Sequence, residues 1–400
     1  MAKSCNVGEV IEKPTTKSHQ IVTLFEEVKM KRKLVFLGLI IALIALPIAA
    51  CAKEAPAPAP APAPSPTPTK SPTPAPSPPS ADVYRLTMGI ISGTSQEYLA
   101  WNPPLYRYQN MVEELSGGRL LIDTKLDVMA AADLPVAVGD GRLDMTKWHQ
   151  VLSSGIFPLW DYISLPFIFD TLYDYELALK DPRLNQLLDQ SYAEEGLVRL
   201  AEFGCDGFTA VWSNEPLQTV DDFKGVKIRA IGLIGTTTMK SMGASPVEMF
   251  KGIGDALQKG TIDAAYTDRV FGFSQGLGDA ASYLNRWMFG PTFGNAIVIN
   301  KDKWEELPPD LQEVLREASQ SIASQVFYAT EFSGRFVEKV VSDAGLVEVI
   351  VPSDAERQKA IGMTRDVVAK AWVEKVGPEG QEILDILKDY FGAYNPEIGK

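Results

Sequence analysis

Cysteine and histidine are scarce in this chain, whose 400 residues include three cysteines and two histidines. Only Cys205 falls in the part that is expected to fold, so a disulfide framework is excluded and we expect Cys205 to be a small buried residue. A Ser–His–Asp site or a histidine-rich zinc site would depend on His149 alone. Hydrolases and zinc enzymes are therefore disfavoured, and we expect neither a bound metal nor a cofactor.

Positive charge is also in short supply. From residue 83 onward the chain carries 29 lysines and arginines against 45 aspartates and glutamates, a net charge of −16. A protein that binds nucleic acid needs a basic surface to neutralise phosphates, and an anionic lipid surface attracts basic side chains as well. We therefore expect no nucleic-acid partner, and we do not expect the folded part to lie on lipid.

One long hydrophobic run stands near the start of the chain. Residues 30–33 read Met-Lys-Arg-Lys, the 17 residues 34–50 are apolar and end in small side chains, and Cys51 follows. This order is typical of a lipoprotein signal peptide over 30–51, with Cys51 lipidated and the rest outside the cytoplasm, anchored to the cell membrane. A single-pass transmembrane anchor is the alternative. It would be short, because such a run rises only about 26 Å against a hydrocarbon core of about 30 Å.

The segments on either side of this signal are not expected to fold. Residues 1–29 mix acidic and basic side chains, unlike the short positive start of a signal peptide, and we interpret them as an extension from a start site read too early. Residues 52–82 form a linker, with twelve prolines between 56 and 79. A polyproline II spacer of this length reaches about 70 Å. A glycosylated stalk is the alternative, and either would hold a folded body away from a surface.

The remaining 318 residues suit two α/β domains. The pattern predicts a strand over 84–91, a helix over 97–115 and a strand over 119–126, which is how a parallel sheet begins. A unit of helix, Gly-x-x-Asp and strand occurs at 136–145 and again at 255–265, which indicates two similarly built domains.

The C-terminal part of the chain is mainly helical in pattern. A long periodic helix is predicted from Pro309 to Val341, followed by a strand over 347–351. Ser353 is expected to cap another helix, and a last helix is expected over 380–391.

Arg229 is the clearest candidate for a binding residue. It ends a predicted strand in which Val226, Ile228 and Ala230 share one face, and Gly232 lies just beyond it. The three threonines at 236–238 are expected to cap a helix that runs to Met242. An arginine at the carboxyl end of a strand, beside a helix N-terminus, suits a ligand carboxylate. A surface arginine paired with Asp221 or Asp222 is the alternative.

These residues carry a resemblance to a known family. The sequence resembles the solute-binding proteins of TRAP transporters, the DctP-type family, over essentially all of 83–400. The matching segments are Asp222-Phe-Lys-Gly-Val-Lys-Ile-Arg-Ala, Met242-Gly-Ala, Asp255 to Asp263, Gly141-Arg-Leu-Asp-Met145 and Phe157 to Phe167.

The resemblance implies a fold and a function. The fold would be a two-domain, type II-like periplasmic-binding-protein fold with a hinge, a ligand cleft and a long helix crossing both domains. Domain I would comprise 83–207 plus 296–334, and domain II would comprise 208–295 plus 335–400. The function would be capture of a small organic acid for sodium-coupled TRAP membrane subunits, and not catalysis.

The resemblance also implies which residues bind the ligand, although this sequence departs from the family at some of these positions. Arg229 matches the arginine that holds the ligand carboxylate, but Thr209 follows Gly-Phe where the family often has a second arginine. Tyr266 and Thr267 replace the Glu-Trp of a metal-using branch, which argues against a metal and leaves the ligand class open. Arg269 is a further candidate for the second positive group.

Aromatic residues complete the expected lining of the cleft. Trp148 and His149 follow the strand of the first Gly-x-x-Asp unit, and Tyr266 and Phe271 follow that of the second. The other tryptophans considered are expected to be packing residues: Trp160, Trp212, Trp287 and Trp304.

Two other functions remain open from the sequence. A surface enzyme could use Asp144, Asp263 or Asp268 as acid or base, although no spacing demands it. A ligand sensor could present its closed form to a receptor instead of a transporter.

Overall fold

The computed structural model describes residues 82–91, 102–169, 171–204, 208–291 and 294–390. The predicted signal with Cys51, the proline-rich linker and Cys205 lie outside the described residues. Within the described residues, every helix is too short or too polar to cross a bilayer.

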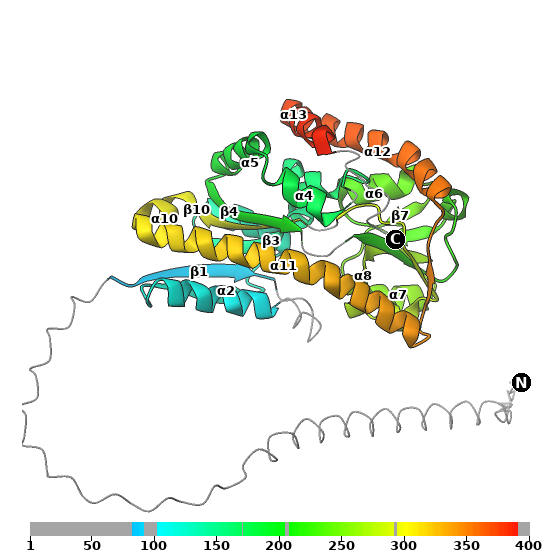
Figure 1. The fold of residues 1–400 in the computed structure, drawn as a ribbon, viewed down its shortest axis with the longest axis horizontal. Coiled ribbons are helices and arrows are strands. Elements are labelled where there is room, and N and C mark those ends of the chain that lie inside the picture. Colours follow the sequence, from blue (N-terminus) through cyan, green and yellow to red (C-terminus); the bar gives the residue numbers. More distant parts are fainter. Residues whose placement is uncertain (1–81, 92–101, 170, 205–207, 292–293, 391–400) are drawn as a thin grey trace, which may run out of the picture. The chain divides into compact units, whose positions relative to one another are not determined.

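The first sheet has five strands in the order β2-β1-β3-β10-β4 (Figure 1). Strand β1 pairs in parallel with β2 and β3, which confirms the predicted parallel opening, whereas β10 runs antiparallel to β3 and β4. The strands are β1 (Tyr84–Ile90), β2 (Leu120–Leu126), β3 (Met145–His149), β4 (Leu197–Gly204) and β10 (Gly294–Asn300).

The second sheet has six strands in the order β11-β9-β5-β8-β6-β7. Strand β6 is parallel to β7 and β8, and β5 is antiparallel to β8 and β9. Read from the opposite edge, the strands β7-β6-β8-β5-β9 follow the same order of parallel and antiparallel pairings as β2-β1-β3-β10-β4 in the first sheet. The strands are β5 (Thr209–Ser213), β6 (Lys227–Arg229), β7 (Ser245–Val247), β8 (Ala264–Asp268), β9 (Tyr283–Asn285) and β11 (Glu348–Ile350).

The repeated Gly-x-x-Asp unit makes the same contact in both sheets. Asp144 follows helix α3 (Leu134–Gly139) and accepts a hydrogen bond from the Thr87 amide of β1 at 2.7 Å. Asp263 follows α7 (Ile253–Gln258) and accepts from the Lys227 amide of β6 at 2.9 Å. Because each aspartate is tied to the neighbouring strand, β3 and β8 begin one residue after it, two to three residues later than the pattern predicts. The two predicted strands are confirmed with later starts, and both carboxylates are occupied by the main chain.

Helix α11 (Pro309–Asp343) joins the two sheets. Its Leu311, Leu315 and Ile322 are buried in the hydrophobic core of the first sheet. Its Val337 and Val341 are buried in a core of the second. Figure 1 shows it passing from one sheet to the other, which confirms the long helix crossing both.

The remaining helices cover the sheets. Helix α2 (Asn102–Leu115) packs on α11. The others are α4 (Leu172–Ala178), α5 (Pro182–Glu194), α6 (Gly232–Ser241), α8 (Arg269–Ser274), α9 (Leu277–Ala280), α10 (Lys301–Glu306), α12 (Asp354–Val376) and α13 (Pro378–Leu387).

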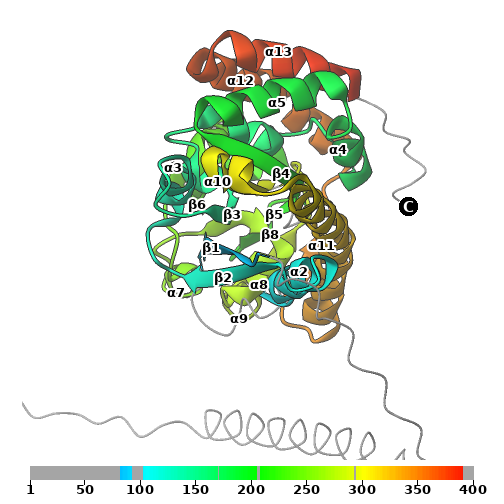
Figure 2. The ribbon, with the colours of Figure 1, turned by 90° about the vertical axis from the view of Figure 1, so that its left-hand side faces the viewer.

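The last helix, α13, packs on a helix of the first-sheet side. Figures 1 and 2 show α13 beside α5, which belongs to the side of the first sheet. Trp372, Ile383 and Leu387 share one hydrophobic core with Trp148 and Leu188. The same core also contains Ile234 of α6, and the domain boundary at 334/335 stays a prediction.

Candidate functional site

Arg229 is fixed in a buried position at the end of β6. Its side chain is 1 % exposed, its Nε donates to the Met249 carbonyl oxygen at 3.1 Å, and its Nη1 donates to that of Tyr266 at 3.1 Å. The guanidinium carbon lies 5.6 Å from the centre of the Phe271 ring on α8. Main-chain carbonyls and an aromatic ring therefore orient a permanent positive charge.

The two aspartates proposed as surface partners for Arg229 are engaged elsewhere. Asp221 pairs with Lys224 at 2.8 Å. Asp222 accepts from the amides of Gln218 and Thr219. The alternative of a surface ion pair is wrong, because the strand directs the arginine into the interior.

Helix α6 begins three residues after Arg229 and has no side-chain cap. Gly232 adopts a φ of 69°, which lets the chain turn from strand into helix immediately. The predicted capping threonines are therefore already inside the helix: the hydroxyl of Thr236 donates to the Gly232 carbonyl and that of Thr238 to Ile234. The capping prediction is wrong, and the main-chain amides of the first turn lie close to Arg229 in sequence.

Tyr266 lies on β8, the strand beside that of Arg229, and Thr209 lies on β5, the strand beyond β8. The Thr209 hydroxyl donates to the Gly290 carbonyl at 2.9 Å and lies 3.4 Å from the Tyr266 hydroxyl. Burial first, and the Asp161 carboxylate as well, raise the pKa of Tyr266 to about 12, so this phenol stays protonated. Strands β5, β6 and β8 and helix α8 thus bring four of the predicted residues together, namely Arg229, Tyr266, Thr209 and Phe271.

Thr267 and Asp268 lie at the buried end of β8. The Thr267 hydroxyl is buried and has no hydrogen-bond partner among the described residues. Asp268 caps α8 by accepting from the Phe271 amide at 2.8 Å, and burial raises its pKa to about 7.

Asp161 is a residue that the sequence reasoning missed. It lies on the short helix η4 (Pro158–Ser164), is 1 % exposed, and accepts from the Ser164 hydroxyl through Oδ1. A β-carbon on Gly232 would stand 3.6 Å from its Oδ2 and 3.2 Å from the Ser154 hydroxyl. Burial raises the pKa of Asp161 to about 7. In the sequence its one signal is a carboxylate within an apolar run.

Trp148 and His149 end β3, but their surroundings differ from the expected lining. The Trp148 ring is fully buried, edge-on to Trp160 at 5.9 Å and to Tyr192 at 6.3 Å. Its indole Nε1 is buried and has no hydrogen-bond partner among the described residues, and the lining role of Trp148 stays a prediction. His149 is also buried, and burial lowers its pKa well below the ordinary value, so the imidazole is neutral. Three of the other tryptophans are buried as expected, and Trp304 is half-buried beneath Arg316.

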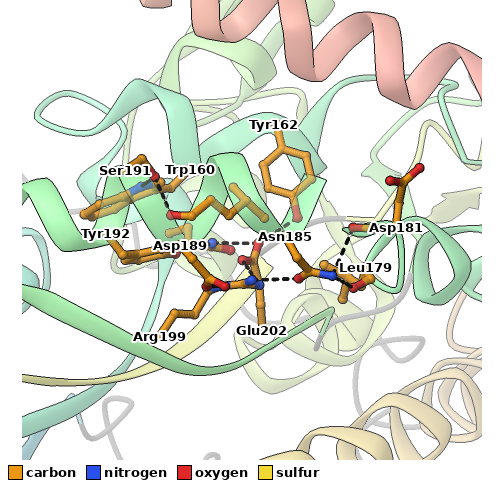
Figure 3. A network of polar contacts seen from close by, with 12 residues as sticks. Trp160, Tyr162, Leu179, Asp181, Asn185, Asp189, Ser191, Tyr192, Arg199 and Glu202 are labelled. Atoms are coloured by element: carbon orange, nitrogen blue, oxygen red, sulfur yellow. Dashed lines mark hydrogen bonds and ion pairs between the residues drawn. The ribbon is translucent and has the colours of Figure 1, made fainter. Parts of the chain in front are cut away.

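A buried polar network fixes the segment that carries Asp161 (Figure 3). Glu202 on β4 accepts from the Tyr162 hydroxyl at 2.8 Å and from the Gln150 side chain at 2.9 Å, and burial raises its pKa. Arg199 reaches Glu202 at 3.4 Å and Asp189 at 2.8 Å. Gln150 belongs to η3 (Gln150–Ser153) and Tyr162 to η4, so the network holds both segments against the first sheet.

Arg269 points its charge at helix α11. It pairs with Glu338 at 3.2 Å, and Arg286 pairs with the same carboxylate at 2.9 Å. Gly334 makes room for the guanidinium, since a β-carbon there would stand 2.8 Å from Nη2. Arg269 is therefore engaged with an acidic side chain of α11, which it shares with Arg286.

Metal binding finds no support in the described part of the chain. Among those residues, no group of three His, Cys, Asp or Glu side chains is arranged to hold a metal ion.

Two matching α/β sheets joined by one long helix, with a buried arginine at a strand end, define a two-domain periplasmic-binding-protein fold. The chain belongs to the DctP family of bacterial extracellular solute-binding proteins, family 7, whose model matches residues 105–375.

Known relatives agree with this assignment. The chain is 25 % identical over 261 residues to the ectoine-binding periplasmic protein TeaA of Halomonas elongata, covering 64 % of this chain and 76 % of TeaA. It is 28 % identical over 233 residues to the C4-dicarboxylate-binding periplasmic protein DctP of Rhodobacter capsulatus, covering 56 % of this chain and 64 % of DctP. The crystal structure of DctP7, a Bordetella pertussis extracytoplasmic solute receptor binding pyroglutamic acid, superimposes with a TM-score of 0.67. That match has 18 % identity and covers 76 % of this chain and all of DctP7, so it shows the shared fold.

Proposed function

We propose that this chain is the solute-binding protein of a TRAP-type secondary transporter and that it captures a small organic acid in an interdomain cleft. The observation that carries the proposal is Arg229, a buried arginine whose guanidinium is oriented by two main-chain carbonyls beside an uncapped helix N-terminus. A planar guanidinium with fixed orientation binds a carboxylate through two parallel hydrogen bonds. The α6 amides would add partial positive charge on the same side.

The chemistry of the relatives supports a carboxylate. Their names report ectoine, a C4-dicarboxylate and pyroglutamic acid, and all three carry at least one carboxylate group. Arg229 would hold this group, while Tyr266, Thr209, Thr267 and Phe271 would shape the rest of the pocket, with His149 on the opposite side.

Capture would proceed by closure of the two domains. A ligand that contacts residues of both sheets binds the closed form better than the open form, and so shifts the population toward it. Contact between the first turn of α6 and Ser154 and Asp161 on the other side is the kind of contact that closure would make.

The N-terminal segments would serve delivery to the membrane subunits. Cys51 would carry the lipid that anchors the protein outside the cytoplasm after removal of the signal, and the linker would let the folded body reach its partner. Labelling of growing cells with a radioactive fatty acid tests this part: a Cys51→Ala protein should not be labelled.

Thermal shift with a panel of acids tests the capture itself. Succinate, malate, pyroglutamate and ectoine are added to the folded body from residue 83 onward, which lacks the proposed signal and linker, and a binder raises the Tm by mass action. Arg229→Ala should weaken the best binder about a hundredfold, since two charge-assisted hydrogen bonds are lost.

Lys227→Ala is the matched control, because Lys227 lies two residues earlier on the same strand but is exposed. It should leave affinity unchanged. Equal affinity of wild type and Arg229→Ala for every acid would refute the clamp.

A further inference from the structure

Among the described residues, two buried carboxylate oxygens have no hydrogen-bond partner, Oδ2 of Asp161 and Oδ2 of Asp268, and that of Asp161 lies on a segment of the first-sheet side. Asp161 is 1 % exposed and bonds to Ser164 through Oδ1 at 2.5 Å. Its Oδ2 is buried and has no hydrogen-bond partner among the described residues. Buried carboxylate oxygens in folded proteins normally accept hydrogen bonds, so such an atom calls for an explanation.

This oxygen faces the start of α6. Gly232 is the first residue of that helix, and a β-carbon there would lie 3.6 Å from Oδ2. Gly235, one turn further on, presents its bare backbone to the Tyr266 ring, with a β-carbon position 3.5 Å from the ring edge. Two glycines one turn apart therefore remove side-chain bulk between Asp161 and Tyr266.

Arg229 belongs to the same junction of strand and helix. It ends β6 three residues before Gly232, and its guanidinium donates to the main chain of Tyr266. The buried arginine and the backbone position that faces Asp161 therefore lie three residues apart on one junction of strand and helix. A ligand carboxylate held by Arg229 would leave the far end of the ligand to meet Asp161.

We propose that Asp161 is a specificity-determining residue, which accepts a hydrogen bond from an N–H or O–H group of the ligand through Oδ2. The preferred ligand is then a small acid that carries a hydrogen-bond donor away from its carboxylate, as in a lactam acid, an amino acid or a hydroxy acid. This inference rests on the proposed function, because it requires Arg229 to hold the carboxylate.

Matched pairs of acids test the inference in calorimetric titrations of the folded body at pH 7.5. Pyroglutamate is compared with 5-oxotetrahydrofuran-2-carboxylate, in which ring oxygen replaces ring N–H, and malate is compared with succinate. We expect the donor-bearing member of at least one pair to bind at least about tenfold more tightly, since a lone pair facing a carboxylate is repelled. The pair that responds tells N–H from O–H recognition.

Asp161→Asn should reduce that preference to about threefold or less, because the amide can also donate to the oxygen analogue. Asp174→Asn is the matched control. Asp174 is another buried carboxylate, but it accepts from Thr171 in the capping box of α4, and its variant should keep the preference.

The outcomes separate the inference from the proposed function. Equal binding of both members of each pair by wild type overturns the inference and needs no variant. The inference is also overturned if Asp161→Asn keeps the preference for the donor-bearing acid, or if it weakens the binding of both acids of a pair equally. Asp161 would then only position α6. If only acids without a hydrogen-bond donor bind tightly, the inference is refuted and the proposed function still holds. Failure of every acid to bind refutes both.

Discussion

The two sheets share one scaffold but differ at their carboxyl ends. Counting from the Gly-x-x-Asp aspartates, Thr146 on β3 corresponds to Ala265 on β8, and their parallel partners are Gly89 on β1 and Arg229 on β6. Gly89 has no side chain, and a β-carbon there would stand 2.4 Å from a Leu143 methyl group. The same position is therefore closed by packing in the first sheet and carries a charged side chain in the second.

This difference bears on the proposed division between residues that hold the fold and residues that bind the ligand. Both aspartates of the repeated unit secure strand pairing, so their recurrence reports architecture. Arg229 occurs at this position in the second sheet only, so the strand arrangement that both sheets share does not depend on an arginine there. The comparison suggests that the second sheet supplies the clamp and the first sheet supplies the opposite wall.

The largest difference in stability should separate the two interiors. Glu202→Ala leaves the Tyr162 hydroxyl and the Gln150 amide without their acceptor and takes from Arg199 its buried partner, so that only the more exposed Asp189 remains, and it should destabilise the protein by about 3–5 kcal/mol. In the second sheet, Asn285 donates to Val211 and Ser213, and Asn285→Ala removes only neutral hydrogen bonds, worth about 1–3 kcal/mol. Urea unfolding monitored by tryptophan fluorescence measures both. A greater loss in Asn285→Ala would show that the charged network is not what holds the first sheet.

The repeated aspartates allow a sharper comparison. Asp144→Ala and Asp263→Ala each lose a hydrogen bond to a strand amide and should cost about 1–2 kcal/mol. Only Asp263→Ala should also weaken acid binding, severalfold. The Asp263 carboxylate anchors strand β6 through the Lys227 amide, and Arg229 lies two residues further along that strand. Calorimetric titration with the best acid checks this. An equal loss of binding in Asp144→Ala would contradict the division between scaffold and site.

A smaller effect should appear in the pH dependence of stability. Burial raises the folded-state pKa of Asp161 to about 7, so between its unfolded value of about 4 and that pH the folded state retains a proton that the unfolded chain releases. This group therefore makes stability fall as the pH rises through that window. Asp161→Asn removes the slope, and its Tm relative to wild type should rise by a few degrees between pH 5 and 7.5. A constant difference across that range would mean that Asp161 is ionised throughout.

Local features of the sequence predicted most of the fold. Strands β1 and β2, helix α11 and the Gly-x-x-Asp units follow from apolar periodicity and glycine placement, which neighbouring residues determine. Arg229 was found for the same reason, since its strand, turn and helix are contiguous in the chain.

Features set by packing between distant segments were not predicted. Asp161 becomes significant only because η4 lies against α6, about 70 residues later in the sequence. The ring of Trp148 packs with Trp160 and Tyr192, whose positions no local pattern gives. The position of α13 depends on a complementary apolar face next to α5, which no local pattern gives.

A crystal structure with the tightest-binding acid of the panel tests the central claim most directly. We predict that the ligand carboxylate accepts two hydrogen bonds from the Arg229 guanidinium at about 2.7–2.9 Å, with both sheets contributing contacts. An acid bound with its carboxylate held by another residue, while Arg229 keeps only its contacts to Met249 and Tyr266, would contradict the account.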